Sequence, residues 1–279
     1  MTPTLLILLA ALAGLLIGSF CNVVIHRLPR IIEQEWQQEL AAWQREQGLT
    51  PVSPEVPPLS LSLPGSHCPC CSTPLRWWQL VPVLSWLLLR GRCTACAGRI
   101  SIRYPLVELS VAGLAVICTM QLGATPAAVA LFGLMTLLLV SALVDWDSQW
   151  LPDRLTLPML WLGLLATASD INPLPVTLGE AVWGAALGWG FLAGLAWVFR
   201  TLTGRDGLGG GDTKLVAALG AWLGPWALPD ILLAAALLGL LTALWQRLRH
   251  GLGGAFPFGP ALALAGAGLV WLHLLQPLH

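Results

Sequence analysis

The sequence predicts an all-α polytopic membrane protein, and three observations support this fold class. Of the 279 residues, 56% are hydrophobic and only 10% are charged, whereas a soluble domain typically carries about 25% charged residues. The mean hydropathy is +0.75. Apolar runs also recur along the chain, and several approach the roughly 20 residues that a helix needs to cross a hydrocarbon core of about 30 Å.

About eight transmembrane helices are predicted from these runs. The first run is followed by Arg27 and Arg30 and preceded by no basic residue. A secretory signal has the opposite order, so we expect an uncleaved helix. The fourth and sixth runs are the shortest. The eight segments are residues 4–25, 106–122, 127–144, 155–168, 180–199, 215–228, 231–246 and 256–275.

The basic residues predict the orientation of these helices. If successive spans alternate in direction, all 14 Lys and Arg residues fall on one side. The loops of the other side contain Asp170 and Asp230 but no basic residue. By the positive-inside rule the basic side is cytoplasmic, which leaves both termini outside.

Three regions are expected along the chain. Residues 1–25 form the first transmembrane helix, residues 26–105 a cytoplasmic insert, and residues 106–279 a polytopic membrane domain. The insert begins with a predicted amphipathic helix, because Ile32, Trp36, Leu40 and Trp43 recur at helical spacing among polar residues.

The insert also contains two C-x-x-C pairs, Cys68 with Cys71 and Cys93 with Cys96, separated by 21 residues. This spacing is typical of two knuckles that supply four thiolates to one zinc ion. Four bound cysteines leave no open coordination position, so a structural zinc knuckle is predicted. Cys70 is an additional thiol beside Cys71, and a redox-active dithiol is the alternative interpretation.

Two aspartates at the predicted cytoplasmic face are the candidate catalytic residues. Asp145 ends the third apolar run, and Asp212 follows three glycines just before the sixth. Two carboxyl groups a few ångströms apart share a proton, as in an aspartyl protease. The pattern alone also fits the cation or proton site of a membrane transporter, with Lys214 neutralising Asp212. The glycines match no nucleotide-binding motif, and no nucleic-acid partner is expected.

An ordered set of motifs resembles the bifunctional type IV prepilin peptidase family, and it extends over nearly the whole chain. Cys21 and Cys70 depart from the family pattern. The motifs are GSFCNVVIHRLP (residues 18–29), the two C-x-x-C pairs, RGRC (90–93), ISIRYPLVE (100–108), DWDSQWLPD (145–153), GGGD (209–212) and PFGP (257–260).

This resemblance implies a multi-pass aspartyl peptidase of the bacterial inner membrane, of the G-x-G-D type, with its active site at the cytoplasmic face. The motifs place the catalytic pair at Asp145 and Asp212. The implied reaction removes a basic leader from type IV prepilins or type II secretion pseudopilins after a glycine. The new N-terminal residue is then methylated with S-adenosylmethionine, whose binding residues the sequence does not identify. Membrane lipid is the other implied partner.

Overall fold

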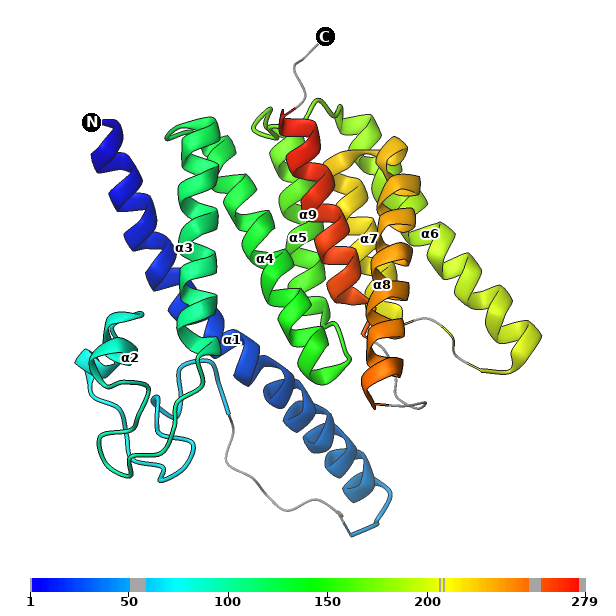
Figure 1. Cartoon of the computed structure of the whole chain (residues 1–279). Coiled ribbons are helices and arrows are strands. Elements are labelled where there is room, and N and C mark those ends of the chain that lie inside the picture. The colour runs from blue at the N-terminus through cyan, green and yellow to red at the C-terminus, as the bar shows by residue number, and fades with distance from the viewer. Residues whose placement is uncertain (1, 51–58, 206, 208, 251–256, 276–279) are drawn as a thin grey trace. The chain divides into compact units, whose positions relative to one another are not determined.

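The computed structural model describes residues 2–50, 59–205, 207, 209–250 and 257–275 (Figure 1). The chain forms two compact units, residues 1–117 and 118–279. Both are helical, and the described residues form no β-strand beyond two isolated bridges. The predicted all-α class is therefore confirmed.

The first unit is built around helix α1 (Pro3–Glu46), a continuous helix of 44 residues. The predicted first span and the predicted amphipathic helix are thus one element, and the predicted boundary at residues 25 and 26 falls inside it. Pro29 also lies within this helix.

Helix α3 (Arg103–Leu122) packs closely on α1 through two glycines. A Cβ atom on Gly14 would lie 2.6 Å from Cα of Ala112, and one on Gly18 would lie 2.7 Å from Cα of Glu108. Small residues of this kind let membrane helices approach backbone to backbone. Between α1 and α3 the chain forms a short 3₁₀ helix, η1 (Trp77–Leu80), and helix α2 (Leu84–Leu88).

The second unit is a helical bundle whose members run side by side in Figure 1. Its elements are α4 (Pro126–Ser148), α5 (Asp153–Ala168), α6 (Leu178–Thr203), α7 (Gly210–Leu223), η2 (Pro225–Ala227), α8 (Leu228–His250) and α9 (Gly259–Leu275). Thr125 caps α4 and accepts a hydrogen bond from the N–H of Ala128. Thr177 and Glu180 form a capping box at the start of α6.

Helix α7 forms the centre of this unit. Every residue from Leu215 to Leu223 is buried, and the helix packs on α5, α6, α8 and α9. A helix that is apolar on all sides belongs in a core. The indole N–H of Trp222 donates to the carbonyl of Met159 in α5, at 3.0 Å, which satisfies the polar atom of the largest fully buried side chain.

Five helical segments in the described part of the chain are long and apolar enough to cross a membrane: α1, α3, α4, α6 and residues 225–245. Helix α9 is apolar but has 17 residues. Helices α5 and α7, in the two shortest predicted segments, have 16 and 14 residues and so reach only about 24 and 21 Å. The multi-pass architecture is confirmed, and the count of eight spans stays a prediction.

Candidate active site and metal centre

Asp145 is buried near the C-terminal end of α4, three residues before the helix ends at Ser148. Its Oδ2 atom accepts a hydrogen bond of 2.9 Å from the backbone N–H of Gly259, the first residue of α9. The N–H groups of a first helical turn have no partner within the helix, so they are ready donors to a carboxylate. The start of α9 therefore fixes the orientation of the Asp145 carboxyl group.

Glycine is required at position 259 by this contact. A Cβ atom there would lie 2.7 Å from Oδ2 of Asp145 and 3.0 Å from its Cγ. Any side chain would push the carboxyl group away from the N–H that holds it.

Asp212 lies in the first turn of α7, two residues after the helix begins at Gly210. It is partly exposed, and its carboxyl group interacts electrostatically with that of Asp145. Helix α9 packs on both α4 and α7, so one element braces the helices that carry the two acids. The structure thus brings these residues to the same end of the second unit.

The glycines before Asp212 allow a second backbone segment to approach, as their lack of side chains predicts. A Cβ atom on Gly211 would lie 2.7 Å from Cβ and 2.8 Å from the carbonyl oxygen of Leu151. Leu151 is buried in the short connection between α4 and α5. The start of α7 therefore packs against the connection between α4 and α5, which follows Asp145 in the chain.

Lys214 forms an ion pair with Asp153, the first residue of α5. The alternative in which Lys214 neutralises Asp212 therefore finds no support. With Lys214 engaged elsewhere, the Asp145–Asp212 pair has the chemistry of two mutually repelling carboxyl groups, one of which can hold a proton while the other acts as a base.

The four cysteines of the two C-x-x-C pairs come together in the first unit. Their Sγ atoms all lie within 4.8 Å of one another. Sγ of Cys68 is 3.8 Å from that of Cys96, and Sγ of Cys71 is 4.0 Å from that of Cys93. Sulfurs around a tetrahedral zinc ion, with Zn–S bonds of about 2.3 Å, are separated by about 3.8 Å. The cluster is therefore compatible with zinc.

Local hydrogen bonds favour the thiolate form at Cys71 and Cys93. The side chain and backbone of Thr73 lower the pKa of the Cys71 thiol to about 6. The backbone N–H groups of Cys96 and Ala95 lower the pKa of Cys93, and the N–H of Ala95 lies 3.4 Å from its sulfur. At Cys96 a hydrogen bond with the Gly98 backbone lowers the pKa, but the neighbouring cysteine side chains and burial outweigh it and raise the pKa to about 12. Cys70 is exposed and does not belong to the cluster.

Sequence reasoning did not find the residues that hold the carboxyl groups in place. Gly259 belongs to the PFGP motif and Leu151 to the DWDSQWLPD motif, but neither was assigned a role. Their positions within these motifs were the available signal. Glu108, the last residue of the ISIRYPLVE motif, accepts a hydrogen bond of 2.7 Å from the N–H of Val83.

Comparison with known proteins agrees with this geometry. Residues 12–122 match the Bacterial Peptidase A24 N-terminal domain, and residues 132–244 match the Type IV leader peptidase family. No solved structure matches the chain significantly.

Similar proteins extend over almost the whole chain. A prepilin leader peptidase/N-methyltransferase of Pseudomonas putida is 45% identical, covering 99% of this chain and 92% of the relative. One of Aeromonas hydrophila is 45% identical over 98% of this chain and 91% of the relative. One of Pseudomonas aeruginosa is 42% identical over 98% and 91%, respectively. The chain therefore belongs to the type IV leader peptidase family.

Proposed function

We propose that this protein is a membrane aspartyl endopeptidase that removes the basic leader of type IV prepilins or type II secretion pseudopilins after a glycine, and that it then N-methylates the new N-terminal residue. The observation that carries the peptidase activity is the carboxyl pair Asp145 and Asp212, braced by α9 within a chain that belongs to the leader peptidase family. Nothing in the structure or the comparisons favours the transporter alternative.

The two aspartates have complementary roles in this proposal. One carboxylate removes a proton from a water molecule as the water attacks the scissile carbonyl, and the partner carboxyl group protonates the leaving amine. The N–H of Gly259 holds Asp145 in the orientation that this exchange needs. Such a pair requires no metal, and the cysteine cluster lies in a different part of the chain.

The site is proposed to face the cytoplasm of the bacterial inner membrane. Basic residues gather on the side of the predicted topology where both aspartates lie, and basic loops are retained in the cytoplasm. A substrate with an apolar N-terminal helix and a basic leader would insert with its leader on that same side. The scissile bond would then lie at the membrane boundary, next to the carboxyl pair.

The methyl transfer would use S-adenosylmethionine as the donor. The names of the relatives include N-methyltransferase activity, and this reaction needs an activated methyl group and an uncharged N-terminal amine. The cofactor supplies an electrophilic methyl group when it is bound. We assign no residue of this chain to its binding.

We also propose that Cys68, Cys71, Cys93 and Cys96 bind one structural zinc ion. The sulfur separations support this assignment. Four thiolate ligands fill the tetrahedral shell, so the ion would stabilise a segment too small to form a core of its own.

Single substitutions of the two aspartates test the peptidase assignment. Purified Asp145→Asn and Asp212→Asn variants are incubated with a pilin precursor and S-adenosylmethionine, and the products are weighed by mass spectrometry. Neither variant should release the leader, whereas Asp170→Asn, at an exposed position after α5, should cleave normally. Leader removal by either of the first two variants would refute the assignment. Methylation of a pre-cleaved substrate by both should persist if the two reactions use separate sites.

A further inference from the structure

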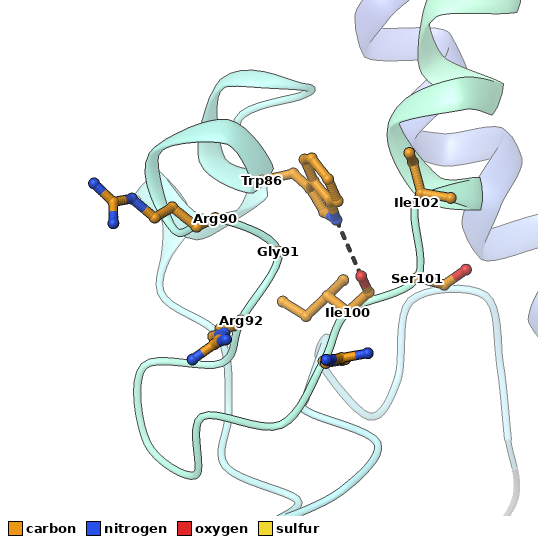
Figure 2. A pocket seen from close by; sticks show the side chains of 8 residues that line it. Trp86, Arg90, Gly91, Arg92, Ile100, Ser101 and Ile102 are labelled. Atoms are coloured by element: carbon orange, nitrogen blue, oxygen red, sulfur yellow. Dashed lines mark hydrogen bonds between the residues drawn. The ribbon is translucent and has the colours of Figure 1, made fainter.

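The first unit contains a second site that the proposed peptidase reaction does not use. A cavity of about 530 Å³ lies beside the zinc knuckle and is lined by Arg90, Arg92, Arg99 and Trp86 among others. Figure 2 shows Trp86, Ile100 and Ile102 around it, with the indole N–H directed at the carbonyl of Ile100. That hydrogen bond measures 3.1 Å. We call this cavity the arginine pocket.

The local backbone brings two of the arginines together. Arg92 and Arg99 pair as an isolated antiparallel bridge, and the N–H of Ile100 donates to the carbonyl of Gly91 at 2.8 Å. Gly91 has φ +64, and a Cβ atom on it would lie 2.8 Å from the ring of Trp86. The turn is therefore fixed, although like charges directly opposite each other in a bridge are destabilising.

Few acidic residues are close enough in the sequence to neutralise the arginines of the pocket. No Asp or Glu occurs between residues 56 and 107, a stretch that contains five arginines. The carboxylate of Glu108, which follows this stretch, accepts a hydrogen bond from the N–H of Val83. Arg90, Arg92 and Arg99 form no ion pair or side-chain hydrogen bond with residues in the described part of the chain. Two negative charges on a zinc–tetrathiolate would still leave the segment positive.

Exposed apolar side chains lie next to the pocket. Leu84, Leu87 and Leu88 of helix α2 are all more than half exposed, and so is Ile102. Ile102 lines the pocket and directly precedes α3, a helix long and apolar enough to cross the membrane. If the first turn of α3 lies at the membrane boundary, the pocket beside it lies at the depth of the lipid headgroups.

We propose that the arginine pocket binds the phosphate of an acidic phospholipid headgroup, with the leucines of α2 inserted among the acyl chains. Arginine side chains bind phosphate oxygens in a bidentate manner, and the inner leaflet attracts basic segments close to a membrane helix. The charge of the pocket disfavours the positively charged molecules of the proposed reaction. A basic leader would be repelled, as would S-adenosylmethionine, whose sulfonium and ammonium groups outweigh its carboxylate.

Hydrogen–deuterium exchange of the full-length, zinc-loaded protein in nanodiscs tests this proposal. The amides of residues 84–102 are followed as phosphatidylglycerol replaces phosphatidylcholine in increasing fractions. We expect these amides to become protected as phosphatidylglycerol is added. Each arginine near an anionic surface contributes about a fivefold factor in binding. The Arg92→Gln/Arg99→Gln double variant should therefore bind the headgroup about 25-fold more weakly, and its amides should be less protected than those of the wild type at every intermediate phosphatidylglycerol fraction.

Matched variants separate lipid binding from misfolding. Arg76→Gln removes one exposed charge of the same segment outside the pocket and should respond like the wild type. Lysines at positions 92 and 99 keep the charge but lose the bidentate contacts, so protection should lie between that of the glutamine variant and that of the wild type. An unchanged zinc content in every variant shows that the knuckle is folded.

Three results would overturn the proposal. Equal protection in pure phosphatidylcholine would mean that α2 inserts without headgroup recognition. Full protection by free glycerol phosphate in phosphatidylcholine discs would indicate a site for a soluble anion. Wild-type sensitivity to phosphatidylglycerol in the double glutamine variant would show that these arginines are not the contact.

Discussion

Replacing Gly259 by alanine should slow leader cleavage strongly without unfolding the protein. The added Cβ atom would lie 2.7 Å from Oδ2 of Asp145, whereas ordinary contact begins at about 3.4 Å. Relieving this contact requires a shift of about 0.7 Å, which lengthens the 2.9 Å hydrogen bond from the Gly259 N–H to at most about 3.6 Å. At that separation the hydrogen bond is lost.

The expected loss of activity follows from the strength of this hydrogen bond. A hydrogen bond to a charged group is worth about 1.5–3 kcal/mol. If cleavage needs Asp145 in its observed orientation, kcat/KM should fall by about 10- to 150-fold. Helix α9 itself should still form, because Gly259 is its first residue and alanine has the higher helix propensity.

Gly268→Ala provides the matched control in the same helix. A Cβ atom at Gly268 meets nothing within 4 Å, so this variant should cleave a pilin precursor at the wild-type rate. Both variants are assayed by mass spectrometry of the released leader, with thermal unfolding measured alongside. The reasoning fails if Gly259→Ala cleaves as fast as the wild type, or if both variants lose activity equally.

Three further substitutions probe the surrounding structure. Gly211→Ala should slow cleavage by about 5- to 150-fold if the roughly 1–3 kcal/mol cost of overpacking falls on the active geometry, because its Cβ would collide with the backbone carbonyl of a buried leucine. Gly210→Ala, which meets nothing within 4 Å, should not slow it. Gly184→Ala should lower the free energy of unfolding by about 1–3 kcal/mol, because α6 and α7 touch there backbone to backbone, while Gly190→Ala on open surface should not. Cys70→Ser should retain one zinc ion per chain by elemental analysis, whereas serine at any cysteine of the cluster should abolish tight binding.

Each of these predictions has a clear contrary result. Equal cleavage rates for Gly211→Ala and Gly210→Ala would mean that the contact of α7 with Leu151 does not position Asp212. Equal unfolding midpoints for the two α6 variants would mean that the close approach of α6 and α7 is not required. Loss of zinc on substitution of Cys70 would mean that Cys70 is itself a zinc ligand.

Much of the fold could be predicted because bilayer thickness and apolar composition constrain each helix locally. Helices α4 and α6 lie where long apolar runs predict them. The continuity of α1 could not be predicted from the sequence. Polar residues begin at His26 and a proline follows at position 29, and both features predict the end of a helix there. A helix leaving the membrane changes its solvent but can keep its backbone hydrogen bonds.

The two acidic residues of the candidate site could be predicted from the sequence, but the residues that hold them in place could not. An ionisable side chain at the end of an apolar run is costly in a membrane protein, so Asp145 and Asp212 stand out in the sequence. The residue that orients Asp145 is 114 positions away, and it contributes a backbone N–H, which any residue except proline carries. The sequence marks such a contact only indirectly, through a glycine whose missing side chain makes room. Motif glycines next to a helix start are therefore as informative about this site as its acids.

The cysteine cluster and the aspartate pair lie in different compact units, so we expect that either site can be disrupted without disrupting the other. All four cysteines of the cluster lie in the first compact unit, and both aspartates lie in the second. The carboxyl pair is braced by α9 and by Leu151, which both belong to the second unit. If the cluster binds zinc as proposed, removal of the ion should disorder the knuckle while the contacts of Asp145 remain. Asparagine at position 145 or 212 should have the opposite effect, because it removes a carboxyl group and leaves the cysteine cluster intact.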